Sequence, residues 1–212
     1  MARSYGGALT GDIYIANQAL DLIHALNINT IGAGLTMEEE QRVANIYEDV
    51  RDALLRRFRW VFAIQQCTIL NSASSYAGAY VPFAYSYISD LPSDCLRVLE
   101  VMNYTGEWRV YANNKLLVDV DTNTDDLEIK YIQQVTDPSL FDACFREIFI
   151  LKLAQKLAKA IGDKKGDWGD LLSEEKIKIV EAMRLSAFED QERVEEDTDK
   201  IEEEDSWVKA GR

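Results

Sequence analysis

Apolar residues recur with a helical period at both ends of the chain and lose that period in the middle. Residues 12–26 carry apolar side chains near one helical face, and residues 36–60 continue a second such stripe. A third helical pattern begins at Pro138 and ends at Gly162, and a fourth begins near Ser173. The sequence therefore predicts two helices before the central region and two after it.

Capping signals mark two of these helices. Thr36 and Glu39 have the spacing of a capping box, and Asp137 stands where it would cap a third helix whose first residue is Pro138. In the fourth helix, the apolar spacing places the following positions on the inner face: Ile177, Val180, Met183 or Arg184, and Ala187.

The central region is rich in Tyr, Val, Ile and Thr, which favour strands. The predicted strands are residues 80–88, 96–102, 108–111, 115–120 and 127–135, and 108–120 is expected to form a hairpin. Residues 91–94 form a predicted turn, in which Asp94 follows Pro-Ser and can bond to nearby backbone N–H groups. We therefore expect Asp94 and Arg97 to be structural residues that fix this turn, as Asp137 and Pro138 fix theirs.

The order of elements predicts an α+β fold. Residues 1–66 and 136–188 would form a four-helix bundle, with an antiparallel β module of residues 67–135 inserted between its second and third helices. Residues 189–212 form an acidic C-terminal extension, with eleven acidic and two basic residues between Glu189 and Asp205. Such charge density is typical of segments that are solvated or disordered until a partner binds, so we expect order only in an assembly.

Charge and cysteine content narrow the class of protein. The 212 residues carry a formal net charge of −14, which disfavours general nucleic-acid binding because the mean field repels phosphates. Cys67, Cys95 and Cys144 show no CxxC spacing, so reduced thiols and no structural metal are expected. No apolar run approaches the length of a membrane span, so no membrane partner is expected.

Catalytic patterns are weak. The one histidine, His24, has no nucleophile and base placed around it. Asp119 to Asp125 begins like a calcium loop, but Thr124 stands where glycine is needed and Lys130 where glutamate is needed. A polar turn is the favoured interpretation, and we expect no catalytic residue, no metal, no cofactor and no enzyme activity.

Three groups of residues are candidate interfaces. The favoured group combines arginines with aromatic residues, as protein interfaces often do: Arg51, Arg56, Arg57, Arg59 and Trp60. The second group lines one face of the third helix and would meet carboxylates or DNA phosphates, unless it is a solvated face: Lys152, Lys156 and Lys159. The third is Trp207, an aromatic anchor in the acidic extension.

Several stretches resemble the tail tubular protein A family, the head-to-tail adaptors of short-tailed bacteriophages. In their order and spacing they cover about residues 12–188. The stretches are Arg51–Leu55 through Trp60–Ala63, Leu91–Val101, Trp108–Val110, Tyr131–Ile132 through Thr136–Asp142 with Phe145, and Leu153–Ala154 to Leu157–Ala158. The acidic extension after Phe188 is longer than is typical of the family.

The resemblance implies a structural virion protein at the head-tail junction, made in the host cytoplasm. Its partners would be the portal protein above, the tail nozzle protein below, and neighbouring copies in a ring of twelve. Viral DNA would pass through the lumen without specific binding, and an acidic lumen suits that passage because every phosphate contact would have to be broken during ejection.

Two hypotheses from other classes remain open. The carboxylates between Asp119 and Asp126 could serve a metal-dependent hydrolase, which a calcium or magnesium titration would test. Alternatively, the acidic extension could make the chain a regulatory module that binds a basic partner. Size measurement with and without a portal ring would separate the adaptor from both.

Overall fold

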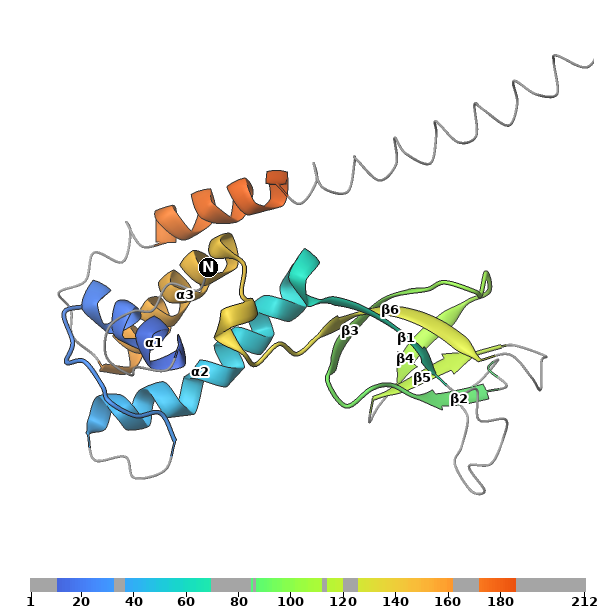
Figure 1. The fold of residues 1–212 in the computed structure, drawn as a ribbon, viewed down its shortest axis with the longest axis horizontal. Helices are drawn as coiled ribbons and strands as arrows, with labels where there is room; N and C mark the ends of the chain where they lie inside the picture. The colour runs from blue at the N-terminus through green and yellow to red at the C-terminus, as the bar shows by residue number, and fades with distance from the viewer. Residues whose placement is uncertain are drawn as a thin grey trace, which may run out of the picture. The chain divides into compact units, whose positions relative to one another are not determined.

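The computed structural model describes residues 11–32, 37–69, 85, 87–111, 114–119, 126–161 and 172–185. Helices and two small antiparallel sheets give the described part a mixed α+β fold (Figure 1), which confirms the predicted class. The chain divides into two compact units, which are described separately below. A helical unit comprises Met1–Tyr47 and Asp142–Arg212, and a β unit comprises Glu48–Phe141.

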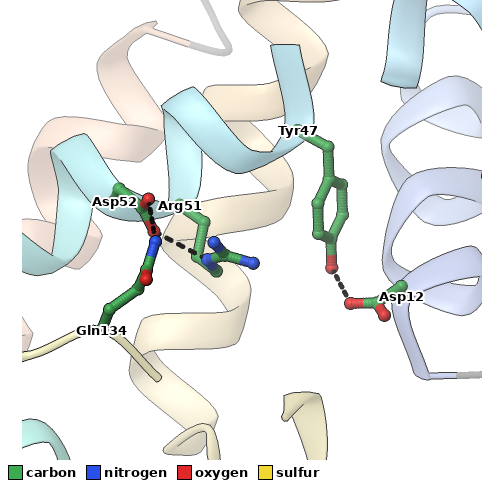
Figure 2. A network of polar contacts seen from close by, with 5 residues as sticks. All are labelled: Asp12, Tyr47, Arg51, Asp52 and Gln134. Carbon is green, nitrogen blue, oxygen red and sulfur yellow. Dashed lines mark hydrogen bonds and ion pairs between the residues drawn. The ribbon is translucent and has the colours of Figure 1, made fainter. Parts of the chain in front are cut away.

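The boundaries between these two units differ from the predicted domain boundaries at residues 66 and 135. The helix α2, Glu38–Arg57, is shared, and its C-terminal half belongs to the β unit. The reason is a set of polar contacts to that half. Trp60 Nε1 donates to the Leu54 carbonyl oxygen at 3.1 Å, and Gln134 Nε2 donates to Asp52 Oδ2 at 2.6 Å (Figure 2).

The helical unit is organised around α3, Ala143–Ile161. The helix α1, Gly11–Leu22, packs against α3, and the N-terminal half of α2 reaches α3 through an edge-on contact between Tyr47 and Phe149, with ring centroids 5.0 Å apart. The Tyr47 hydroxyl also donates to Asp12 Oδ1 at 2.7 Å, which ties α2 to α1 (Figure 2). Phe145, Phe149 and Leu153 are fully buried, so α3 supplies much of this core.

The first helix ends four residues earlier than predicted. His24 has a left-handed backbone (φ 55°), its N–H donates to Asp21 O at 3.1 Å, and the Ala25 N–H donates to Leu20 O at 3.0 Å. These two bonds form a Schellman motif, which closes the helix and satisfies its last carbonyl groups. The lone histidine is therefore part of a helix end, and Leu26 lies beyond the helix.

The start of α2 uses a different glutamate from the one predicted. Glu40 is buried and accepts a hydrogen bond from the Met37 N–H at 3.1 Å, as the third residue of a capping box does. Glu39 does not take this place, because Met37 is the residue before the first helical residue, Glu38. Thr36 lies outside the described residues.

Pro138 does not begin the third α-helix. It begins a 3₁₀ turn, η2 (Pro138–Leu140), in which Asp137 accepts from the Ser139 N–H at 2.8 Å. Phe141 is extended (φ −67°, ψ 130°), which interrupts the helix, and Asp142 then caps α3 by accepting from the Cys144 N–H at 2.8 Å. The predicted capping residue thus caps a short turn, and a second aspartate caps the helix.

The last helix, residues 172–185, turns the opposite face inward from the one predicted. Glu175 and Ala182 are its buried residues. The predicted inner residues Ile177, Val180 and Met183 are 48–59% exposed, and Arg184 is exposed as well. Ala187 lies outside the described residues. The cause is a polar contact with α3, described below.

The β unit contains two three-stranded antiparallel sheets, ordered β1-β6-β3 and β2-β5-β4. The strands are β1 (Ile64–Ile69), β2 (Tyr87–Asp90), β3 (Cys95–Val101), β4 (Trp108–Tyr111), β5 (Lys115–Val118) and β6 (Leu127–Gln133). A 3₁₀ turn, η1 (Val61–Ala63), leads into β1. The predicted hairpin is confirmed, since β4 pairs with β5 and Asn114 takes the left-handed conformation (φ 59°) between them.

The two sheets bury one common core. Its members come from both sheets and from the turn before β3: Ile69, Leu91, Val98, Val101, Leu116, Val118, Leu127, Ile129 and Tyr131. The strand β1 was not predicted, because only its ends, Ile64 and Ile69, are strongly apolar. It forms through pairing with β6, in the register Cys67 to Ile129, and its middle is exposed.

Candidate functional site

The C-terminal end of α2 presents a basic surface on an acidic chain. Arg56 and Arg57 end the helix, Arg59 follows, and all three side chains are exposed. Positive charge here is favourable because the helix C-terminus carries a partial negative charge. Val61 is 51% exposed beside them. We call these residues, with Phe58, the arginine surface.

Aromatic packing holds the arginine surface in place. The Arg57 guanidinium lies over the Phe58 ring at 5.1 Å from its centroid, a cation–π geometry. Phe58 in turn contacts Trp60 edge-on at 5.8 Å. Trp60 is only 5% exposed and is fixed by its bond to Leu54 O. The guanidinium of Arg57 is therefore supported by an anchored aromatic pair.

Two members of the predicted arginine–aromatic group are not at the surface. Arg51 is 4% exposed, and its Nε bonds to Asp52 Oδ1 at 2.8 Å (Figure 2). Trp60 is buried as described above. The helical period explains the difference, since Arg51 shares the inner face of α2 with Leu54 and Leu55, whereas Arg56 lies on the outer face.

Of the two predicted turn residues, Arg97 contacts this surface and Asp94 contacts β6. Arg97, on β3, donates from Nη1 to the Arg56 carbonyl oxygen at 3.1 Å. Asp94, in the turn before β3, accepts from Gln133 Nε2 at 2.7 Å and from the Tyr131 hydroxyl at 3.4 Å. Its carboxylate therefore joins the turn to β6, rather than to nearby backbone N–H groups as predicted.

Asp94 changes the acid–base properties of its neighbours. Burial raises the pKa of the Cys95 thiol to about 11, and the Asp94 charge adds to this shift. Burial likewise raises the pKa of Tyr131 to about 12, again with a contribution from Asp94. Cys67 on β1 has a raised pKa for the same two reasons. A thiol reacts as its thiolate, so these cysteines are weak nucleophiles at neutral pH.

The lysine row on α3 is partly used inside the helical unit. Lys152 Nζ lies 2.9 Å from Oε1 of Glu175, which is 3% exposed, and Gln155 Nε2 donates to the other Glu175 oxygen at 2.8 Å. Lys156 and Lys159 are exposed. The Lys152 ammonium therefore contacts the last helix while its side chain remains 30% exposed, and Lys156 and Lys159 are more fully exposed.

The last helix has an apolar outer face as a result. Glu175 bonds inward to α3, and Lys178 Nζ pairs with Glu147 of α3 at 3.0 Å. The exposed apolar residues of this helix are Leu172, Ile177, Val180, Met183 and Leu185. Ala182 still faces inward, and exposed charged residues such as Lys176 and Arg184 lie among these apolar side chains. Exposed apolar side chains gathered on one helix are typical of protein contacts.

A scan against protein-family models finds no match. A search of curated proteins finds none either.

The hydrolase hypothesis concerns the acidic loop of residues 119–126, of which the structure describes only the two end residues. Tyr104 Oη donates to Asp119 O at 3.0 Å and accepts from the Asp119 N–H at 3.1 Å. Asn103 donates to Asp126 O at 2.7 Å and accepts from the Glu128 N–H at 2.9 Å. Residues 120–125 lie outside the described residues. Among the described ones, no three metal-ligating side chains gather at one point.

Sequence reasoning missed Glu175, Asn103 and Tyr104. A glutamate in a helix is normally solvated, and only its spacing from Lys178 and Ala182 on one face hinted at an inward position. Nothing local to Asn103 or Tyr104 signals contacts with residues 15 to 25 positions later.

Trp207 and the acidic extension lie outside the described residues. In the described part of the chain, no helix is both long enough and apolar enough to cross a membrane.

Proposed function

We propose that the chain is a subunit of a head-to-tail adaptor ring in a short-tailed bacteriophage, a structural protein without catalytic activity. The ring would join the portal to the tail nozzle and form part of the DNA conduit. One observation supports this most. Three stretches that carry the family resemblance, far apart in the sequence, meet at the C-terminal half of α2.

The first stretch supplies α2 from Arg51 onward and η1. The second, Leu91–Val101, supplies the turn and β3, and reaches the first through the bond from Arg97 to Arg56 O. The third, from Tyr131, reaches it through the bond from Gln134 to Asp52. Residues shared with a family are thus concentrated where the β unit joins α2 and where the arginine surface is exposed.

The exposed surfaces suit a ring protein. Each copy in a closed ring needs two different lateral faces that complement each other, together with faces for the portal and the nozzle. The arginine surface and the apolar outer face of residues 172–185 provide two chemically different faces. We propose that α3 and the three other helices form a bundle, and that the net charge of −14 lets DNA pass without lasting contacts.

Assembly should depend on the portal. Self-repulsion between acidic chains opposes unaided closure of a ring, so the isolated chain should form monomers and small open oligomers. The test is to mix the purified chain with its portal ring and image the product by electron microscopy. A closed ring seated on the portal is expected. Failure to bind the portal, or a stable closed ring of the isolated chain in dilute buffer, would contradict the proposal.

A further inference from the structure

We propose that the arginine surface binds the acidic segment 189–205 of a second copy of this chain. The inference rests on the proposed function in one respect, namely that copies assemble side by side. The surface is defined by three exposed arginines with Phe58 and Val61. The segment is defined by its sequence, eleven acidic and two basic residues.

Charge complementarity identifies the occupant. Between Arg56 and Arg59 the chain gathers three exposed guanidinium groups within four positions, and guanidinium groups form paired hydrogen bonds with carboxylates. The densest run of carboxylates in the same chain is segment 189–205. The guanidinium groups of the arginine surface and the carboxylates of this segment therefore carry the opposite charges needed to pair.

Apolar contacts favour a peptide over DNA as the occupant. Phe58 is half-buried and Val61 is 51% exposed, so the surface offers apolar area between its charges. The acidic segment contains Val194 and Ile201, which can cover that area, whereas a phosphate backbone has nothing to place there. Arg57 stacked on Phe58 is also pre-positioned, which lowers the entropy cost of binding.

The arginine surface complements the acidic segment, but neither of them complements a second copy of itself. A basic surface repels its own copy, and so does an acidic segment, so a symmetric dimer through either one is disfavoured. Pairing one with the other leaves a free surface at one end and a free segment at the opposite end. This is a head-to-tail contact, the kind that builds rings or open chains.

Charge-reversal variants of the full chain test the contact in sedimentation velocity, at about 0.15 M salt, where long-range repulsion is screened. The first variant is R56E/R57E/R59E. The second is E202K/E203K/E204K. Each alone should weaken association of the wild-type chain by about tenfold or more. A matched control, R109E/K156E/R184E, reverses three other exposed cations and should associate as the wild type does.

Mixing the two variants decides the question. The first variant keeps an unchanged acidic segment and the second keeps an unchanged arginine surface, so the mixture should regain association that neither partner shows alone. Unchanged thermal unfolding of each variant shows that the fold is intact. The proposal is overturned if the wild-type chain stays monomeric at every concentration, if the control is impaired equally, or if mixing restores nothing.

Binding tests with DNA and with the portal separate the remaining outcomes. A short DNA duplex that binds the wild type but not R56E/R57E/R59E would assign the surface to phosphates and overturn the inference. If wild-type chain seats on the portal while the mixed variants show no rescue, the adaptor role stands and the inference fails. If the variants rescue each other but the wild type ignores the portal, the adaptor role fails instead.

Discussion

Arg97 on β3 donates a hydrogen bond from Nη1 to the main-chain carbonyl oxygen of Arg56, 3.1 Å away and 41 positions earlier in the chain. Arg56 lies in the last turn of α2, where carbonyl groups lack helical partners. The guanidinium therefore serves as a cap supplied by a distant strand. It fixes the direction in which α2 ends, and with it the position of the arginine surface.

We expect Arg97→Ala to lower the free energy of unfolding by about 1 kcal/mol, because a helix-terminal carbonyl loses its charged donor. Urea unfolding followed by circular dichroism measures the loss. Arg109→Ala is a suitable control, since Arg109 is an exposed arginine on β4. Equal stability of the two variants would show that the bond to Arg56 contributes nothing in solution.

Asp94→Asn should destabilise the β unit by about 1–3 kcal/mol, because a charged acceptor for Gln133 and Tyr131 is lost. It should also lower the pKa of Cys95, since the Asp94 charge is one cause of its elevation. Thermal unfolding and pH-dependent alkylation of Cys95 report the two effects. Unchanged stability with abolished ring assembly would instead place Asp94 in an interface.

Alkaline pH should destabilise the protein through Cys95 and Tyr131. Their folded-state pKa values, about 11 and about 12, exceed the ordinary values of 9.0 and 10.0. The folded state holds these protons more tightly, so this contribution to stability is complete below pH 9 and is lost as pH rises from there to about 12.

Two measurements check this. Urea unfolding at successive pH values should show stability falling above pH 9, with a shallower fall in Cys95→Ala. At pH 8 only about 0.1% of Cys95 is thiolate, so iodoacetamide should modify it about a hundredfold more slowly than a free thiol. Rapid alkylation at pH 8 in the folded state would contradict the assigned burial.

Glu175→Ala should lower stability by about 1–3 kcal/mol, because Lys152 and Gln155 lose their shared acceptor. The adjacent Glu174 is exposed, so Glu174→Ala should change stability by no more than about 0.5 kcal/mol. Thermal unfolding of both variants gives the comparison. If the two variants behave alike, the inward face of residues 172–185 is wrongly assigned.

Ser89→Ala should stabilise the protein. The Ser89 hydroxyl on β2 is fully buried and has no hydrogen-bond partner among the described residues. It lies on the same face as its register partner Leu116 of the common core. Removing it relieves the cost of an unsatisfied polar group, by about 1 kcal/mol. A higher unfolding temperature is expected, and a lower one would show that the hydroxyl is satisfied in solution.

The sequence predicts those elements whose signal is local. The hairpin of β4 and β5 follows from two short runs of strand-favouring residues on either side of an asparagine turn, and α3 follows from its continuous apolar stripe. The strand β1 gives no such signal, because it is an exposed edge strand that depends on β6. The outward apolar residues of 172–185 also escaped prediction, since the inward position of Glu175, which forms a part-buried ion pair with Lys152, is not indicated by its residue type.

The candidate site was predicted only in part, because residue type is visible in the sequence whereas the burial of each side chain is not. Residue type alone marks Arg56, Arg57 and Arg59 as a basic cluster. Their separation from Arg51 depends on which face of α2 is buried, and this becomes clear only once the β unit is packed against the helix end. The role of Asp94 likewise depends on side chains 37 and 39 positions away, which no local pattern connects.

The paired anchors Asn103 and Tyr104 make residues 120–125 a natural site for inserted sequence. Tyr104 holds Asp119 and Asn103 holds Asp126 and Glu128, so the entrance and exit of this segment are fixed by one neighbouring turn. Loop closure costs rise only slowly with length, and here the two ends are already joined. An epitope or fluorescent tag inserted within residues 120–125 should therefore leave the strand register unchanged, and would label the chain at a defined point for microscopy.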